Sequence, residues 1–430
     1  MHTDNPFSAL SRQRDIYTKG VSGARPLAPT QADALEERAR ACMSEAAFAY
    51  IAGGAGGELT LRRNRSAFGR WGIVPRLLRD VSAADTSVVL LGRRLPAPIL
   101  LSPVGVLDMA HPEADLAVGR AAASLGLPFI FSNQASVAME QTAAVMGSGP
   151  RWFQLYWSKS RELVASFVQR AEACGCEAIV VTLDTTMLGW RPRDLDLAYL
   201  PFLRGRGIAQ YTSDPVFQRL IDEPDAEGAA PARSRIRPAT LKALWELTRR
   251  YPGPFWGNLR SGRPLKAVRK FIGLYTNPAL NWDDLPFLRE HTRLPILLKG
   301  IVHPDDARRA MDAGMDGLVV SNHGGRQVDG AVSSIEMLPA LAEATGGALP
   351  LILDSGVRTG ADVFKALALG ATAVAVGRPY AYGLAIGGQA GVEEVLANLW
   401  ADFELTMRLS GCTSVREITA RQLQPLGQWQ

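Results

Sequence analysis

The sequence has few of the features that mark disulfide-rich, metal-binding or membrane-spanning proteins. It contains four cysteines, and their spacing matches neither a metal-ligand pattern nor a C-x-x-C redox pattern. No uninterrupted apolar run approaches the roughly 20 residues that cross a bilayer. The N-terminal stretch MHTDNPFSALSRQRD lacks the apolar segment of a signal peptide. These absences predict a cytoplasmic protein with reduced thiols, no metal site and no membrane span.

An excess of one charge sign is also missing. The chain has 47 basic and 42 acidic residues spread along its length. Such a balance is typical of a solvated surface and argues against nucleic acid as a partner. One local exception is the basic stretch, residues 249–270, where seven Lys and Arg residues occur with three aromatic residues and no acidic residue. Apolar residues make up 47% of the chain and charged residues 21%, as in ordinary folded proteins.

Short apolar runs recur from residue 98 onward. Each run is too short for a helix and rich in Val, Ile and Leu, and amphipathic helix-like segments separate the runs. Eight strands buried on both faces and alternating with helices predict an α/β fold, a (β/α)8 TIM barrel. An open doubly wound sheet with two domains is the alternative. The runs begin at residues 98, 128, 151, 178, 295, 317, 350 and 373.

Two regions do not follow this rhythm. Residues 1–97 precede it, and we expect them to form an N-terminal helical cap followed by a short hairpin at SVVLLGRRLPAP. Residues 98–430 would then form the barrel domain. Residues 195 to about 280 interrupt the barrel after its fourth strand with Pro-, Gly- and Arg-rich sequence and a helix near 238–250. Because a connection this long is usually functional, we interpret it as a lid over the site.

Polar residues close most of the eight runs. The active site of a (β/α)8 barrel lies at the carboxyl ends of its strands, so these side chains should meet at one mouth. Simple turns would be mostly Gly, Asn and Pro, whereas this set contains Lys, His, Gln and Tyr. The set is Pro103, Gly105, Ser132, Gln154, Tyr156, Thr182, Asp184, Lys299, Ser321, His323, Asp354, Gly377 and Arg378.

His323 is the candidate general base. The other four histidines lie at the N-terminus, before prolines at helix starts, or in a polar helix tail. His323 instead ends an apolar run in SNHGGRQ, where two glycines let the backbone approach a ligand and Arg326 can bind an anion.

The ends of the last two runs indicate a phosphorylated ligand. DSGVRTG and VGRPYAYG place Gly356, Arg358, Gly377 and Arg378 where barrels commonly bind phosphate. The glycine run GGAGG at 53–57 follows a helix and has the spacing of neither a dinucleotide fingerprint nor a P-loop. A nicotinamide cofactor is therefore not expected.

These motifs resemble those of the FMN-dependent 2-hydroxy acid oxidases and dehydrogenases. SNHGGRQ at 321–327 is the most specific, and FQLYW, VTLDT, LLKG, DSGVRTGADVFKALALGA and GRPY occur in the family's order. YIAGGAGGELTLRRN, GWRPRDL and YLPFLRG are most similar to the lactate 2-monooxygenase branch. The resemblance covers nearly the whole chain. It implies FMN as cofactor, oxidation of a lactate-like L-2-hydroxy acid with oxygen as acceptor, subsequent oxidative decarboxylation, and a homo-oligomer, either a tetramer or an octamer.

The resemblance also implies a role for each site residue. Lys299 would lie by N1 and O2 of the flavin ring, where a fixed positive charge favours the reduced, anionic form. Other residues would hold the flavin ring, namely Pro103, Val104, Gly105, Ser132, Gln154 and Thr182. A further group would hold the ribityl chain and phosphate, namely Ser321, Asp354, Gly356, Arg358, Gly377 and Arg378.

The remaining implied roles concern the substrate. Arg191 and Arg326 would bind its carboxylate, because guanidinium groups suit bidentate contacts. Tyr50 and Tyr156 would donate hydrogen bonds to it. His323 would accept a proton from it, and Asp184 would stabilise the imidazolium that forms.

Two positions depart from the family pattern. Gln134 stands where relatives often have a large apolar or aromatic side chain, so the pocket wall is more polar and lactate itself is in question. Gly105 stands where several oxidases have Ala, beside the expected flavin N5 position. A side chain at 105 is expected to point toward the flavin and the bound product.

Three alternatives stay open at this point. One is a simple oxidase that releases the keto acid and hydrogen peroxide. Another is a membrane-associated dehydrogenase that passes electrons to quinone and uses the basic stretch as a surface patch. The third is a non-catalytic FMN- or phosphate-binding barrel, against which His323 and Arg326 argue.

Overall fold

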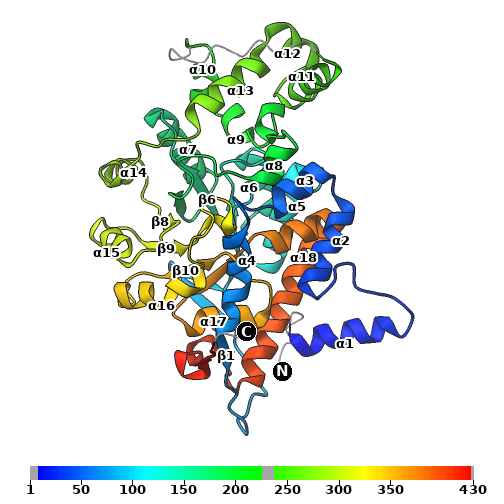
Figure 1. Cartoon of the computed structure of the whole chain (residues 1–430), viewed down its shortest axis with the longest axis vertical. Helices are drawn as coiled ribbons and strands as arrows, with labels where there is room; N and C mark the ends of the chain where they lie inside the picture. The colour runs from blue at the N-terminus through cyan, green and yellow to red at the C-terminus, as the bar shows by residue number, and fades with distance from the viewer. Residues whose placement is uncertain (1–7, 225–236, 428–430) are drawn as a thin grey trace.

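Eight parallel strands form a closed barrel at the centre of the molecule (Figure 1). The computed structural model describes residues 8–224 and 237–427. Around the barrel the strand order is β10-β11-β4-β5-β6-β7-β8-β9, which confirms the predicted (β/α)8 barrel and excludes the open sheet. The strands are β4 (Ile99–Leu101), β5 (Phe129–Phe131), β6 (Arg151–Tyr156), β7 (Ile179–Thr182), β8 (Ile296–Lys299), β9 (Gly317–Val320), β10 (Leu351–Asp354) and β11 (Ala373–Val376).

The barrel strands are mostly apolar because both of their faces are buried, and the polar exceptions are Arg151 and Gln154 in β6 and the strand-end residues Thr182, Lys299 and Asp354. Leu100, Ile130 and Val180 belong to the cluster that fills the barrel interior. Their sequence neighbours Leu101 and Phe131 belong to the larger cluster between the strands and the helices. Since side chains alternate along a strand, a strand with two buried faces favours a nearly continuous apolar run over strict alternation, which is the pattern seen in the sequence.

A helix follows each barrel strand, and its local sequence sets its ends. Ser160 caps α7 by accepting a hydrogen bond from the backbone N of Leu163 at 3.3 Å. Gly126 ends α5 in the left-handed conformation. The barrel helices are α5 (Ala114–Leu125), α6 (Met139–Met146), α7 (Arg161–Ala173), α14 (Leu285–His291), α15 (Pro304–Asp312), α16 (Ser334–Thr345), α17 (Gly360–Ala368) and α18 (Arg378–Leu409).

The segment before the barrel contributes helices and a hairpin. The hairpin expected near residue 90 consists of β2 (Val88–Leu90) and β3 (Arg93–Leu95), and Leu90 and Leu95 pack into the interior cluster of the barrel. A second small sheet pairs β1 (Trp71–Ile73) with β12 (Leu423–Pro425) near the C-terminus. The helices are α1 (Ala9–Gly20), α2 (Ala32–Cys42), α3 (Glu45–Ala52) and α4 (Leu59–Ser66).

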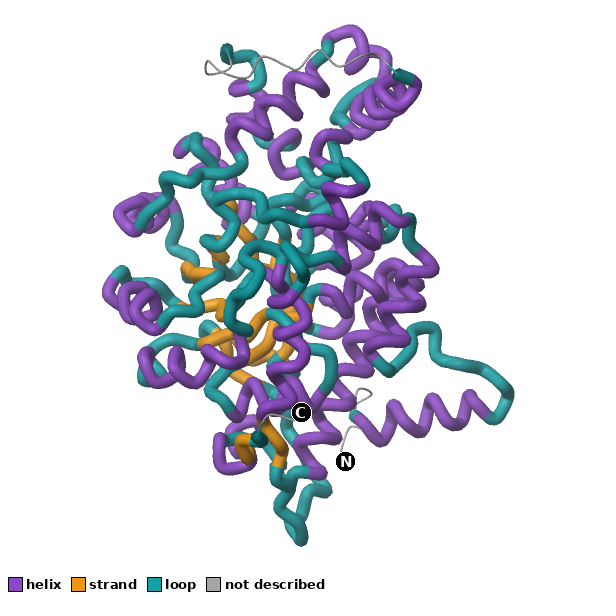
Figure 2. The backbone as a smooth tube through the Cα atoms, viewed as in Figure 1, coloured by secondary structure: helices purple, strands orange, loops and turns teal. Residues whose placement is uncertain are grey.

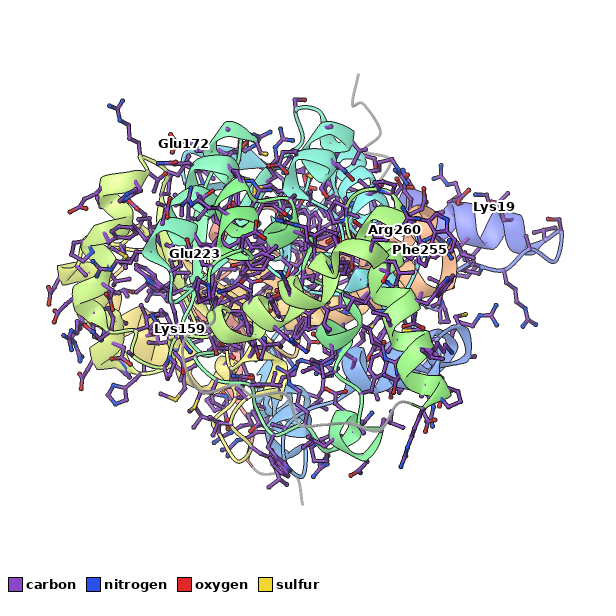
Figure 3. The ribbon with its side chains drawn as sticks, turned by 90° about the horizontal axis from the view of Figure 1, so that it is seen from above. Lys19, Lys159, Glu172, Glu223, Phe255 and Arg260 are labelled. Carbon is purple, nitrogen blue, oxygen red and sulfur yellow. The ribbon has the colours of Figure 1, made fainter. Side chains whose placement is uncertain are left out.

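A long insertion between β7 and α14 lies beyond one end of the barrel. In its described part it contains helices and loops without strands (Figure 2), and residues 225–236 lie outside the described residues. The helix expected near 238–250 is α11 (Pro238–Arg250). Seen from above, Phe255 and Arg260 of α12 lie on the side of the molecule toward Lys19, away from Lys159 (Figure 3). The other helices are α8 (Pro192–Asp196), α9 (Ala209–Thr212), α10 (Pro215–Leu220), α12 (Phe255–Ser261) and α13 (Arg263–Leu274).

Aromatic packing holds the insertion together. The ring of Phe271 in α13 lies 4.8 Å from that of Tyr211 in α9 and 5.3 Å from that of Phe202. Tyr211 and Phe271 are fully buried, and the ring of Tyr211 also lies 4.9 Å from that of Phe167 in α7, so these contacts join the insertion to the core between strands and helices. Among the residues described, we find no helix with the length and apolarity needed to cross a membrane.

Candidate active site

A cavity opens at the carboxyl ends of the barrel strands. It encloses about 1100 Å³, part of which is open to solvent. Most of the residues expected from the sequence line it, although they come from segments far apart in the chain. These are Tyr50, Pro103, Val104, Gly105, Ser132, Tyr156, Arg191, Lys299, His323, Arg326, Asp354, Gly356, Arg358, Gly377 and Arg378.

Four expected residues do not line the cavity and lie behind those that do. Asp184 bonds to His323, and Ser321 bonds to Lys299 and Asp354. Gln154 accepts a hydrogen bond from Ser132, and Thr182 accepts one from Gln154. Asp184, Ser321 and Gln154 are therefore one hydrogen bond away from the cavity wall, and Thr182 is two away.

His323 and Asp184 form a hydrogen-bonded pair at the mouth of the barrel. Nδ1 of His323 lies 2.8 Å from Oδ1 of Asp184 and 3.1 Å from Oγ1 of Thr185. Burial would raise the pKa of Asp184, but the charges of Lys299 and His323 and its hydrogen bonds hold that pKa at about 2. The carboxylate is therefore ionised, which places the proton of the neutral imidazole on Nδ1 and leaves Nε2 free to accept another.

The imidazole of His323 is neutral near pH 7. Burial lowers its pKa from 6.5, and the charge of Lys299 acts in the same direction, while Asp184 opposes them. A group that is neutral at working pH and backed by a carboxylate can take a proton and keep it as a stabilised cation. This is the arrangement that a general base requires.

The backbone at His323 is strained. Its φ of 57° lies in the left-handed region, which side chains other than glycine seldom adopt. Hydrogen bonds from the backbone N of His323 to Ser321 Oγ and from the N of Gly324 to Ser355 Oγ, both 3.0 Å, hold the turn. Strained backbone conformations that surrounding hydrogen bonds hold in place are common at functional sites. They orient a side chain in a direction that a relaxed turn would not give it.

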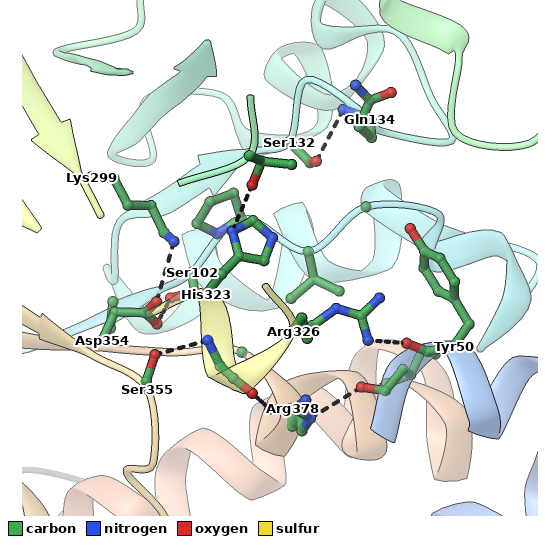
Figure 4. A pocket seen from close by; sticks show the side chains of 18 of the residues that line it. Tyr50, Ser102, Ser132, Gln134, Lys299, His323, Arg326, Asp354, Ser355 and Arg378 are labelled. Atoms are coloured by element: carbon green, nitrogen blue, oxygen red, sulfur yellow. Dashed lines mark hydrogen bonds and ion pairs between the residues drawn. The ribbon is translucent and has the colours of Figure 1, made fainter. Parts of the chain in front are cut away.

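Two guanidinium groups face His323 across the cavity. Figure 4 shows Arg326 beside Tyr50, on the opposite side of the cavity from His323 and Lys299. Arg326 donates to the carbonyl oxygens of Tyr50 and Gly53 and lies 4.9 Å from the centre of the Tyr50 ring. Burial and the charge of Arg191 lower the pKa of Arg326 to about 9.

Arg191 lies next to Arg326 and is fixed by its neighbours. It donates to the backbone oxygen of Arg326 and to Oε1 of Gln327, both at 3.2 Å. Among the described residues, neither arginine makes an ion pair with a carboxylate. Two adjacent cations that make no ion pair within the described structure can bind an anionic ligand, and their planar groups match a carboxylate.

Tyr156 keeps its proton under all ordinary conditions. Burial raises the pKa of Tyr156 far above its ordinary value, and the nearby Asp184 and Tyr50 add to the effect. The hydroxyl of Tyr156 can therefore donate a hydrogen bond into the cavity.

Lys299 is the centre of a buried polar group. Its Nζ donates to Ser321 Oγ at 3.0 Å and lies 3.4 Å from Oδ2 of Asp354. Asp354 also accepts hydrogen bonds from Ser102 and Ser321, both at 2.6 Å. Burial would raise the pKa of Asp354, but Lys299 and these hydroxyls lower it. A charged lysine is thus fixed at the base of the cavity.

A row of buried polar side chains borders the cavity beside Lys299. Ser132 Oγ donates to Gln154 Oε1 at 3.2 Å, and Gln154 Nε2 donates to Thr182 Oγ1 at 3.0 Å. These groups offer donors and acceptors at one edge of the site, which suits a ligand with amide-like groups.

The opposite end of the cavity carries two more cations. Arg378 donates to the backbone oxygens of Ile51, Gly53 and Gly324, and Arg358 donates to its neighbour Val357. In the described residues neither makes an ion pair with a carboxylate. Burial lowers the pKa of Arg358 to about 10 and also lowers that of Arg378. Because α18 begins at Arg378, its amino-terminal amides add positive potential here.

The strand-end pattern missed several residues of the site. Ser102 and Ser355 also follow barrel strands, so the same pattern could have included them, whereas Thr185 follows the predicted Asp184 directly. Phe202 and Tyr275 line the cavity from the insertion, where no periodic pattern marked them.

Comparisons with known proteins agree with this geometry. The model of the FMN-dependent dehydrogenase family matches residues 39–425. An L-lactate oxidase of Lysinibacillus sphaericus is 41% identical over 93% of this chain and 94% of its own length. An FMN-dependent alpha-hydroxy acid dehydrogenase of Penicillium citrinum is 41% identical over 96% of this chain and 95% of its own. The crystal structure of a mandelate oxidase with (S)-4-hydroxymandelic acid superposes with a TM-score of 0.75 at 37% identity, covering 92% of this chain and 98% of that one.

Proposed function

Because the chain belongs to the FMN-dependent dehydrogenase family, we propose that it oxidises an L-2-hydroxy acid with oxygen as acceptor and then decarboxylates the bound 2-keto acid. FMN-dependent oxidation of a 2-hydroxy acid is the activity of the family. The L configuration, the oxygen acceptor and the decarboxylation are our additions. The observation that carries the proposal is that His323, backed by Asp184, lines one cavity together with Arg191 and Arg326, which make no ion pair in the described structure.

The residues of the cavity fit FMN. Arg358 and Arg378 are cations that lack a carboxylate partner in the described chain, as expected where a phosphate binds. Ser132 lines the cavity, and Gln154 and Thr182 are hydrogen-bonded in a row behind it, which gives this wall the polar edge that a flavin ring requires. When bound, FMN supplies the two-electron acceptor for substrate oxidation.

The chain's own residues then position the substrate and move its proton. Arg191 and Arg326 would hold the substrate carboxylate, and the hydroxyl of Tyr156 would donate to its oxygen. Nε2 of His323 would accept a proton from the substrate, and Asp184 would stabilise the resulting imidazolium through Nδ1. Lys299 would add a fixed positive charge beside the flavin ring.

Retention of the keto acid distinguishes the proposed monooxygenase from an oxidase. In the monooxygenase, the bound keto acid reacts with hydrogen peroxide and yields the shortened carboxylic acid, carbon dioxide and water. Phe202 and Tyr275 of the insertion line the cavity and support the interpretation of the insertion as a lid. The resemblance of GWRPRDL and YLPFLRG to the monooxygenase branch supports the same choice.

Product stoichiometry tests this choice. Carbon dioxide, keto acid and peroxide are measured per substrate consumed. We expect about one carbon dioxide per turnover and little free peroxide. One peroxide per turnover without carbon dioxide would reject the monooxygenase and leave the oxidase, which the relatives support equally.

The quinone-linked alternative depends on the basic stretch as a membrane patch. Two of its cations serve the fold of the insertion, since Arg263 pairs with Asp222 at 2.9 Å and Lys270 donates to the Glu223 carbonyl at 3.0 Å. Trp256 and Arg249 are exposed and would be free to meet lipid. Flotation with anionic vesicles distinguishes the membrane-associated dehydrogenase from the proposed function, and we expect the protein not to bind the vesicles.

The cytoplasmic location and the homo-oligomer stay predictions.

Arg378→Ala should weaken FMN retention about tenfold, because one charge-assisted hydrogen bond contributes about 1.5–3 kcal/mol. The dissociation constant of FMN is measured by titrating the flavin-free protein and following fluorescence. Arg308→Ala, at an exposed position on α15, is the control. Unchanged FMN affinity in Arg378→Ala would remove Arg378 from the phosphate site.

Gly105→Ala should shift the products toward keto acid and free peroxide. A Cβ at 105 would lie 2.9 Å from Gln134 Cβ and 3.1 Å from the Gln134 carbonyl oxygen, so the methyl crowds this wall of the cavity. Its φ is outside the left-handed region, so the backbone itself tolerates Ala. A crowded wall should release the keto acid earlier and raise the peroxide yield severalfold. Gly273→Ala, which has open space on α13, is the matched control.

A further inference from the structure

Gln134 presents an unsatisfied amide to the active-site cavity. It lines the cavity and is 5% exposed, yet neither Nε2 nor Oε1 has a hydrogen-bond partner of good geometry in the described structure. Leaving a buried polar group without a partner costs about 1–3 kcal/mol. Such a group in a cavity wall indicates a ligand that satisfies it.

The position of this amide is fixed by its backbone. The backbone N of Gln134 donates to Ser132 Oγ at 3.1 Å, and its carbonyl accepts from the N of Val106 at 2.9 Å. A Cβ added at position 105 would lie 2.9 Å from Gln134 Cβ, so the glycine at this position makes room for the Gln134 side chain in the wall. Figure 4 places Gln134 beside Ser132, on the side of the cavity opposite Arg378. The amide therefore lies apart from the phosphate end of the site.

The surroundings of Gln134 are aromatic and uncharged. Its amide contacts the hydroxyl of Tyr211, a fully buried residue that also lacks a well-formed hydrogen bond and whose pKa is raised by burial. Phe202 and Tyr275 line the adjacent wall, with ring centres 5.9 Å apart. Arg191, whose charge acts on Tyr275, is assigned above to the carboxylate of the 2-hydroxy acid, so a second ionised group placed against these rings would lack a counter-ion of its own, which is unfavourable. An uncharged group that both donates and accepts would satisfy the amide.

We infer that the substrate carries a second, uncharged hydrogen-bonding group, a hydroxyl or carboxamide, on its side chain, and that Gln134 binds this group. This inference rests on the proposed function, because it names the class of 2-hydroxy acid that the site takes. Gln134 is then a residue that determines specificity. A site built to pair with a polar group discriminates against an analogue that lacks it, because its own polar atoms are left unpaired.

Isosteric substrate pairs test the inference. In each pair a methyl group replaces a hydroxyl: L-2,4-dihydroxybutanoate against L-2-hydroxypentanoate, and (S)-4-hydroxymandelate against (S)-4-methylmandelate. The kcat/KM of each acid is measured with wild-type holoenzyme and with Gln134→Leu. We expect the wild type to prefer the hydroxylated member of at least one pair by about tenfold or more, and Gln134→Leu to abolish or reverse this preference.

The outcomes separate this inference from the proposed function. If the wild type oxidises both members of each pair equally well, or if Gln134→Leu leaves a preference unchanged, the inference is overturned and the proposed function stands. If no acid of either pair and no plain 2-hydroxy acid is oxidised, both are overturned. The ratio of the two kcat/KM values within a pair does not depend on the total activity of the preparation. If Gln134→Leu fails to fold, equal kcat/KM values for both members of each pair in the wild type are enough to overturn the inference.

Discussion

His323→Gln is expected to lower the rate at which substrate reduces the bound flavin by at least about 100-fold, the lower range for loss of a general base. Gln has a similar size and can hydrogen-bond to Asp184, so the ionised carboxylate keeps a partner. It cannot accept a proton as imidazole Nε2 does. The fold and the FMN content should therefore stay close to those of the wild type.

The rate is measured by anaerobic rapid mixing of substrate with holoenzyme, and FMN content by absorbance after denaturation. His303→Gln is the matched control, because His303 is exposed on the surface at the start of α15. A variant that loses FMN would show a structural role for His323. Near-normal reduction in His323→Gln would remove this residue from the mechanism.

Arg326→Lys is expected to lower kcat/KM by about 100-fold, with most of the loss in substrate binding. An ammonium keeps the charge but cannot form the bidentate contact to a carboxylate, and one charge-assisted hydrogen bond contributes about 1.5–3 kcal/mol. Lys would also lose the contacts that Arg326 makes with the Tyr50 ring and the Gly53 carbonyl.

The loss is measured as KM and kcat for the best substrate, and as the affinity of an unreactive carboxylate such as the matching 2-keto acid. Arg308→Lys, far from the cavity on α15, should leave both unchanged. Equal binding of the keto acid by Arg326→Lys and wild type would contradict the assignment of Arg326 to the carboxylate.

The barrel was predictable because its constraint is local. A strand with both faces buried is mostly apolar, and all eight barrel strands showed such a run, with polar residues chiefly at their ends. The same reasoning located His323 and Lys299, since the residue after each run lies at the mouth of the barrel. The helix at 238–250 was predictable from its own sequence, whereas the shape of the insertion was not, because it depends on the packing of Tyr211 against Phe271.

The chemistry of the site depends on contacts that no local pattern contains. His323 and Asp184 are 139 positions apart, and only the closed barrel brings Nδ1 within 2.8 Å of the carboxylate. The resemblance to a known family supplied that pairing, and the structure supplies its physical basis in the lowered pKa values of both groups. Neither the sequence pattern nor the family resemblance could show that Gln134 has an unsatisfied amide. A departure from the family pattern does not say whether the amide has a hydrogen-bond partner.

The most direct test of the account is anaerobic mixing of the purified holoenzyme with a panel of single-enantiomer 2-hydroxy acids while the flavin absorbance is followed. The account predicts that the L enantiomer of at least one acid bleaches the flavin, that the D enantiomer of the same acid does not, and that admission of oxygen restores the colour. If no 2-hydroxy acid in the panel bleaches flavin that dithionite reduces readily, the central claim is contradicted.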